Sequence, residues 1–139
     1  MKKIFNLLLL FLISFMLCGC TKQVVILDRN INTVKNDFDK YIKSTGYEYK
    51  LKDDENNIYN VHLMEYNAQF LLQSKPIISF DMGFTCKFKE LGNDTLLNCK
   101  TYPSSTSQLT DVNRYLKEQK FDGIRYISYK KYLRNKGNL

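Results

Sequence analysis

Two stretches of the chain carry apolar residues at a spacing of three and four, which is typical of one face of an amphipathic helix. The first covers residues 31–42, with Asn30 as a candidate N-cap and Gly46 as a C-terminal stop. The second covers residues 109–120 and is broken by the sequence at 121–123. The pattern therefore predicts two helices that are far apart in the chain.

Between these helices, apolar and polar residues alternate with a period of two, which is typical of β-strands. The clearest run covers residues 78–88, where one face holds Ile78, Phe80, Met82, Phe84, Cys86 and Phe88. We predict a long strand here with one buried and one wet face, and with Gly83 as a bulge or bend in its middle. Further candidate strands lie at 47–51, 58–64, 68–72, 95–102 and 124–129.

A tight turn at Gly92-Asn93 would fix how the two strands on either side of it pair. If these are the two central turn residues, Cys86 lies directly across from Cys99. Directly opposed residues on antiparallel strands have Cα atoms about 4.5–5.5 Å apart, a separation that a disulfide can span. We therefore predict a disulfide between Cys86 and Cys99, with two buried free thiols as the alternative.

These elements indicate an α+β fold in one small two-layer domain. An antiparallel β-meander of four to six strands has one dry face, and two amphipathic helices can cover it. We assign this domain to residues 30–129 and the segment after it, residues 130–139, to a basic C-terminal tail.

The start of the chain has the pattern of a targeting segment. Two lysines precede an apolar run over residues 4–17, which is shorter than the about 20 residues that a membrane-spanning helix requires. The run ends in Leu17-Cys18-Gly19-Cys20, which resembles the lipobox of bacterial lipoproteins. The resemblance implies that signal peptidase II removes residues 1–19 as a signal peptide and that Cys20 carries a diacylglyceryl group.

Such a lipid anchor implies where the protein resides. Two or three acyl chains hold a protein stably at a membrane while its domain remains in water. We expect an extracytoplasmic protein that is lipid-anchored to the bacterial envelope. In a cell with two membranes we expect the outer one, because Thr21 is not the aspartate that retains enterobacterial lipoproteins at the inner membrane. Residues 20–29 would be the lipidated N-terminus and a tether, although 24–27 is apolar enough to form a first strand.

The charge of the chain limits the class of partner. The formal net charge is +7, and it is +5 once Lys2 and Lys3 leave with the signal peptide. Outside the cytoplasm, a basic domain meets anionic lipids or wall polymers before it meets nucleic acid, so we expect no nucleic-acid partner.

Tyrosines and cations are interleaved near the C-terminus, which suggests a binding surface. This candidate surface, here named the C-terminal patch, consists of Arg125, Tyr126, Tyr129, Lys130, Lys131, Tyr132 and Arg134. The alternative is a solvated tail with a few rings packed on the domain.

Catalytic and cofactor chemistry has little support in the sequence. His62 is the only histidine, so a zinc site of three histidines cannot be built, and we expect this residue on the wet face of its strand. The polar turn at 53–57 lacks the glycine and glutamate of an EF-hand loop. We expect no metal, no cofactor and no small-molecule substrate.

We therefore predict a non-enzymatic envelope lipoprotein that binds another envelope protein, as an assembly accessory. Exposed aromatic residues of the sheet would contribute to the binding surface, with Tyr47, Tyr49 and Tyr59 expected on the first hairpin. The alternative function is binding of anionic lipid or cell-envelope polymer through the basic C-terminal segment.

Overall fold

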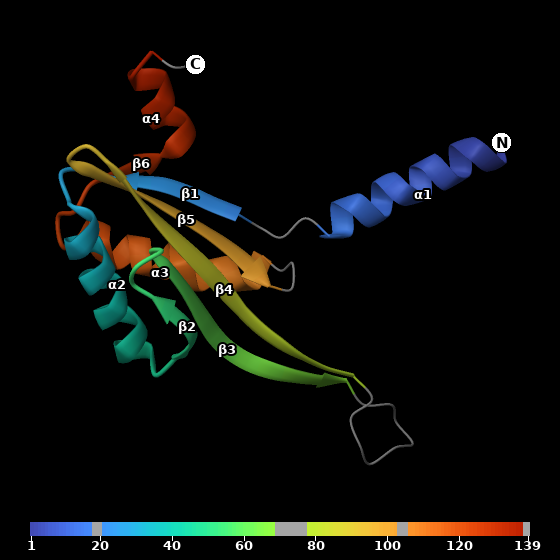
Figure 1. Cartoon of the computed structure of the whole chain (residues 1–139), viewed down its shortest axis with the longest axis horizontal. Helices are drawn as coiled ribbons and strands as arrows, with labels where there is room; N and C mark the ends of the chain where they lie inside the picture. The colour runs from blue at the N-terminus through green and yellow to red at the C-terminus, as the bar shows by residue number, and fades with distance from the viewer. Residues whose placement is uncertain (18–20, 69–77, 103–105, 138–139) are drawn as a thin grey trace.

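Six strands form one antiparallel sheet in the order β2-β3-β4-β5-β1-β6 in the computed structural model, which describes residues 1–17, 21–68, 78–102 and 106–137 (Figure 1). The strands are β1 (Thr21–Ile26), β2 (Glu48–Asp53), β3 (Ile58–Ala68), β4 (Ile78–Leu91), β5 (Asp94–Tyr102) and β6 (Tyr126–Ser128). Strands β2 to β5 form a meander, as the alternating pattern predicts. Together with the helices they confirm the α+β fold class.

Two helices cover one face of the sheet, namely α2 (Ile31–Thr45) and α3 (Thr106–Phe121). The start of α2 is capped as predicted, because the Asn30 side chain accepts a hydrogen bond of 2.9 Å from the backbone N–H of Thr33. The helix ends at Gly46, whose φ of 78° is the left-handed conformation that glycine adopts readily. Two further helices are α1 (Lys2–Leu17) and α4 (Tyr129–Asn135). None of the helices in the described ranges is long and apolar enough to cross a membrane.

The core lies between the sheet and the two covering helices. Aromatic rings fill much of it, with Phe38 of α2 making edge-to-face contacts with Phe84, Phe88 and Tyr115 at centroid distances of 5.2–6.4 Å. The other buried members of this cluster are Val24, Ile26, Val34, Tyr41, Ile42, Tyr59, Val61, Cys86, Leu97, Cys99, Val112 and Leu116.

The turn at Gly92-Asn93 sets the register of β4 against β5 as predicted. Leu91 pairs with Asp94 across the turn, and Cys86 pairs with Cys99 further along the hairpin. This hairpin is the part of the fold in which sequence and structure agree residue by residue.

The bulge expected at Gly83 lies instead on the neighbouring strand. The register of β3 shifts between His62 and Met64, so Leu63 is the extra residue opposite β4. A Cβ at position 83 would overlap the backbone oxygen of Val61 and the hydroxyl of Tyr102. Gly83 is therefore required for this close approach rather than for a bend of its own strand.

The segment expected as a tether is a strand inside the sheet. β1 pairs with β5 on one side and with β6 on the other, which decides between the two alternatives for residues 24–27. Val24 and Ile26 join the main core, whereas Val25 points to the opposite face and is also fully buried. A run of consecutive buried apolar residues is what a strand covered on both faces requires.

The C-terminal segment is helical where a tail was expected. Ser128 caps the start of α4 by accepting a hydrogen bond from the backbone N–H of Lys131 at 3.2 Å. α4 contacts β1 and β6 at the edge of the sheet, and Figure 1 shows it projecting from that edge. β6 itself confirms the edge strand predicted within residues 124–129. The candidate strand at 68–72 has only Ala68 in the described part, at the end of β3; residues 69–72 lie outside it.

Candidate functional site

The tyrosines of the first hairpin are packed and hydrogen-bonded, so the expectation of an exposed aromatic surface there is wrong. Tyr59 is only 2% exposed and its hydroxyl donates to Asp54. The Tyr49 hydroxyl donates to Asp39 of α2 at 2.9 Å. Alternation predicted one dry face for this hairpin but gave no sign that the second layer supplies carboxylates to bond its hydroxyls.

A third tyrosine, Tyr47, joins this hairpin to α3. Its hydroxyl donates to Asp111 Oδ1 at 2.8 Å, and Tyr41 of α2 donates to the Asp111 backbone oxygen at 3.1 Å. Asp111 thus ties two elements to α3, which is a structural role.

Burial, followed by hydrogen bonds to these aspartates, raises the pKa of Tyr47, Tyr49 and Tyr59. Burial raises the pKa of Tyr41 to about 12. Burial also acts on Asp39, but hydrogen bonds from Lys43 and Tyr49 outweigh it and lower the pKa of this carboxyl. The hydroxyls therefore remain protonated donors and Asp39 remains ionised at neutral pH, so the cluster is a stabilising network.

The polar turn at 53–57 directs its oxygens at a lysine. The buried ammonium of Lys35 donates to the Asp54 backbone oxygen and to Asn57 Oδ1, both at 3.0 Å. Asp53 accepts a hydrogen bond from the backbone N–H of Asn56 at 3.0 Å. Within the described ranges, no group of three or more His, Cys, Asp or Glu residues is arranged to hold a metal ion.

His62 lies half-buried in β3, where it pairs with Gly83 on one side and with Glu48 on the other. The strand pattern placed it on the wet face, opposite the buried Val61, and the structure agrees with that face.

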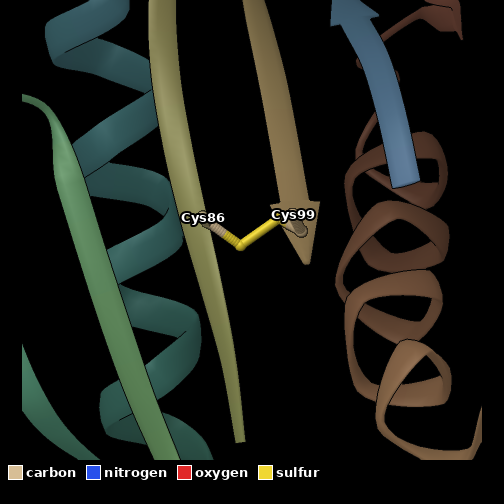
Figure 2. The surroundings of a disulfide bond; sticks show 2 residues. All are labelled: Cys86 and Cys99. Carbon is tan, nitrogen blue, oxygen red and sulfur yellow. A yellow bond between two sulfur atoms is a disulfide. The ribbon is translucent and has the colours of Figure 1, made fainter. Parts of the chain in front are cut away.

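The Cys86–Cys99 disulfide is formed, as the hairpin register predicts (Figure 2). It joins the neighbouring strands β4 and β5, and the two Cα atoms are 4.0 Å apart. Both cysteines are fully buried in the main core. A buried disulfide in this position contributes to stability and is shielded from reagents in solution.

The lipidation candidate Cys20 lies outside the described residues, which resume at Thr21 with the first residue of β1. Any anchor on Cys20 is therefore joined to the sheet without an intervening linker.

The C-terminal patch divides into two parts in the structure. Arg125 and Tyr126 belong to the body of the domain: Arg125 pairs with Asp28 at 2.5 Å, and Tyr126 packs against the main core. The remaining five residues lie on α4.

Within α4, aromatic and basic side chains differ in exposure. Tyr129 and Tyr132 are half-buried, whereas Lys130, Lys131 and Arg134 are exposed. The helix therefore presents three cations to the solvent, a surface that attracts anions. Lys136, directly after the helix, lies over the Tyr132 ring at 5.5 Å from its centroid.

The end of α3, where the sequence predicts a helix break, carries an exposed aromatic residue. Phe121 is 92% exposed. After residue 20, Leu51 is the other large hydrophobic residue with an exposed side chain among those whose burial the structure describes. Phe121 and Lys120 line one depression together with Arg114, Lys117, Glu118 and Asp122. Lys120 also lines a second depression with Leu27, Gly123, Ile124, Arg125, Tyr126 and Ile127. We name Phe121 and the side chains of these two depressions the α3 end surface.

This surface lies at the end of the sheet far from Thr21. β6 begins beside the end of β1, where Tyr126 pairs with Ile26 and the backbone N–H of Leu27 donates to the backbone oxygen of Arg125. β5 ends beside the start of β1, and α3 then runs back along the sheet (Figure 1). A sequence signal for Phe121 does exist, because it follows Leu116 by five residues and so falls outside the three-and-four spacing.

No protein-family model and no curated protein matches this chain.

Proposed function

We propose that the protein is a bacterial lipoprotein that is anchored through Cys20 to the extracytoplasmic side of the envelope, and that its domain is a non-enzymatic module for binding another envelope protein. The N-terminal pattern up to Leu17-Cys18-Gly19-Cys20 supports the anchor. Because β1 begins at Thr21, an anchor on Cys20 would hold the domain at the start of this strand.

The observation that carries the binding function is Phe121. A phenyl ring that is 92% exposed loses hydrophobic stabilisation unless a partner covers it. Aromatic residues are enriched in the buried centre of protein interfaces, and arginine is enriched there as well. The depression beside Phe121 holds both cations and carboxylates, so the fitting partner has an apolar pocket with charges of both signs at its rim. These charged residues are Arg114, Lys117, Lys120, Glu118 and Asp122.

The anchor is tested with Cys20→Ala. We expect this variant to lose palmitate labelling and to leave the membrane fraction. Continued labelling of the variant would refute the lipoprotein assignment.

The binding function is tested by crosslinking in intact cells, followed by purification of the lipoprotein and mass spectrometry, at low and at high salt. We expect a protein partner that is retained at high salt and lost with Phe121→Ser. Asn113→Ser, at an exposed position of the same helix, is the matched control and should keep the partner. A partner recovered equally with both variants would exclude the α3 end surface.

A second candidate function is binding of an anionic lipid or envelope polymer through α4, which the exposed Lys130, Lys131 and Arg134 favour. Changing these three residues to glutamine should then weaken retention of the anionic ligand without unfolding the domain. Binding of this kind is lost at high salt, which distinguishes it from the first candidate.

A further inference from the structure

Two lysines lie beside the first residue of the sheet, on the face that points away from α2 and α3. Thr21 of β1 pairs with Lys100 of β5, and Lys100 pairs with Thr85 of β4. Two residues further along the same strands, Lys87 pairs with Asn98. These five residues line one depression, and both lysines are exposed.

The chemistry of this depression suits a phosphate group. Its lining residues supply two ammonium groups, two hydroxyls and one carboxamide, all of which can donate hydrogen bonds to an anion. No carboxylate is among the described residues that line it. Lysine binds phosphate as a point charge, so two lysines here attract anionic headgroups without requiring a fixed geometry.

The depression lies where an anchored chain meets its membrane. Thr21 directly follows Cys20, so its Cα lies about 3.8 Å from that of the anchor residue. A strand rises about 3.3 Å per residue, and Lys87 is two residues from Thr85, which lies level with Thr21 across the sheet. Lys87 is therefore about 7 Å along β4 from the level of Thr21. That separation is within the screening distance of about 8 Å at physiological ionic strength.

The hairpin of β3 and β4 determines which face can lie along the bilayer. β4 extends from Thr85 to Ile78, about 23 Å past the level of Thr21, and Figure 1 shows this hairpin running on beyond the start of β1. If the strands were perpendicular to the membrane, this hairpin would enter the hydrocarbon region. The paired positions Glu65 and Asp81 would then lie there, and burying charged residues in hydrocarbon is unfavourable. Since α2 and α3 cover the opposite face, and Val25 and Leu96 are buried at the far end of β1, the part of the lysine-bearing face around Thr21 is the one that fits the membrane surface.

We propose that this face of the sheet, through Lys87 and Lys100, binds the phosphate groups of anionic lipids in the membrane that holds Cys20. This inference rests on the proposed lipid anchor. In this orientation, the layer of α2 and α3 lies on the side away from the membrane, so the α3 end surface is accessible to a partner.

The test is lysine footprinting of the mature protein, purified from membranes and reconstituted in phosphatidylcholine vesicles with or without phosphatidylglycerol. Reductive methylation and peptide mass spectrometry report how fast each lysine reacts. We expect Lys87 and Lys100 to react about fivefold more slowly in the anionic vesicles, the factor for one lysine at an anionic surface. Lys117 on α3 should react equally in both. Equal rates for Lys87 and Lys100 in the two vesicles would overturn the proposal.

Variants show whether the two lysines cause the contact. Lys89 lies on the same face and pairs with Leu96, so it reports on the contact without being changed. The protection of Lys89 in anionic vesicles should fall in Lys87→Gln/Lys100→Gln. It should persist in the matched control Lys40→Gln/Lys43→Gln, which removes two exposed lysines of α2. Persistence in both variants would exclude a role for the two lysines.

Two further measurements separate the ways in which the proposal could fail. If inorganic phosphate protects Lys87 and Lys100 in detergent as fully as anionic vesicles do, the depression is a site for free phosphate, and the lipid assignment is wrong. The intact mass of the same sample reports the anchor: missing acyl groups on Cys20 refute the proposed function, whereas an acylated protein with unprotected lysines refutes this inference alone.

Discussion

The two faces of the β4–β5 hairpin are built from alternate residues of the same strands and have opposite chemistry. On the face covered by α2 and α3 lie Phe84, Phe88 and the disulfide, all buried. On the other face lie Lys87 and Lys100, both exposed. Because alternate side chains point to opposite sides of a sheet, neighbouring residues in one strand have separate roles.

This contrast shows where stability and binding are located. Substitutions on the covered face should lower the free energy of unfolding and alter binding only by unfolding the domain. Substitutions at the exposed positions of the lysine-bearing face should alter stability much less, whereas Val25 and Leu96 on that face are buried.

Phe84→Ala should lower the free energy of unfolding by about 3–5 kcal/mol, because it leaves a cavity beside Phe38 in a fully buried site. Thr85→Ala, one residue along on the other face, should lower it by about 1 kcal/mol or less, because Thr85 is half-buried in a central strand. Urea unfolding of both variants measures the difference. If Phe84→Ala does not fold, Phe84→Leu supplies a smaller loss that can be measured. Equal effects of the substitutions at 84 and 85 would contradict the assignment of the two faces.

Replacing both cysteines, Cys86→Ala with Cys99→Ala, should lower the free energy of unfolding by up to about 3 kcal/mol, since the disulfide closes a short loop in the unfolded chain. The loss should be the same when the unchanged protein is unfolded with a reductant present. A stability that neither treatment alters would show that the bond does not constrain the chain.

Alkaline pH should unfold the domain through its buried tyrosines. Burial, together with nearby aspartates, raises the pKa of Tyr47, Tyr49 and Tyr59, and burial raises the pKa of Tyr41 to about 12. The unfolded chain ionises its tyrosines near pH 10, so the stabilisation is complete below that pH and is lost as the pH rises toward 12. Circular dichroism and tyrosinate absorbance, recorded together, measure this. Full ionisation of all tyrosines with the fold intact would contradict the hydrogen-bonded cluster.

Tyr49→Phe should lower the free energy of unfolding by about 1 kcal/mol, because it removes one hydrogen bond to Asp39 while leaving the ring in place. Asp39 keeps its ion pair with Lys43, which limits the loss. Tyr129→Phe, at a half-buried position on α4, is the control. It should change the free energy of unfolding by only about 0.3 kcal/mol. A larger loss in the control than in Tyr49→Phe would contradict the difference between the two groups of tyrosines.

Local patterns predicted the parts of the fold that depend on local chemistry. Asn30 and Gly46 bound α2 because capping depends on a few neighbouring backbone groups. The turn at Gly92-Asn93 fixed the register of the hairpin, and the register brought Cys86 to Cys99. Alternation in β4 identified its buried face.

Features that depend on distant segments could not be predicted in this way. Val25 is buried on the side of the sheet opposite the main core, which follows only from the placement of β1 between β5 and β6. The tyrosines of the first hairpin are bonded by carboxylates from α2, α3 and the turn after β2. Phe121 departs from the helical spacing, but its exposure depends on where α3 ends relative to the sheet.

The central claim is that the anchored domain binds a protein partner through the α3 end surface. Its most direct test places a photo-crosslinking amino acid at position 121 in intact cells, with position 113 on the same helix as the exposed control. We predict one discrete protein adduct from position 121 at both low and high salt, and none from position 113. No adduct from position 121 in a membrane-anchored protein, or equal adducts from both positions, would contradict the claim.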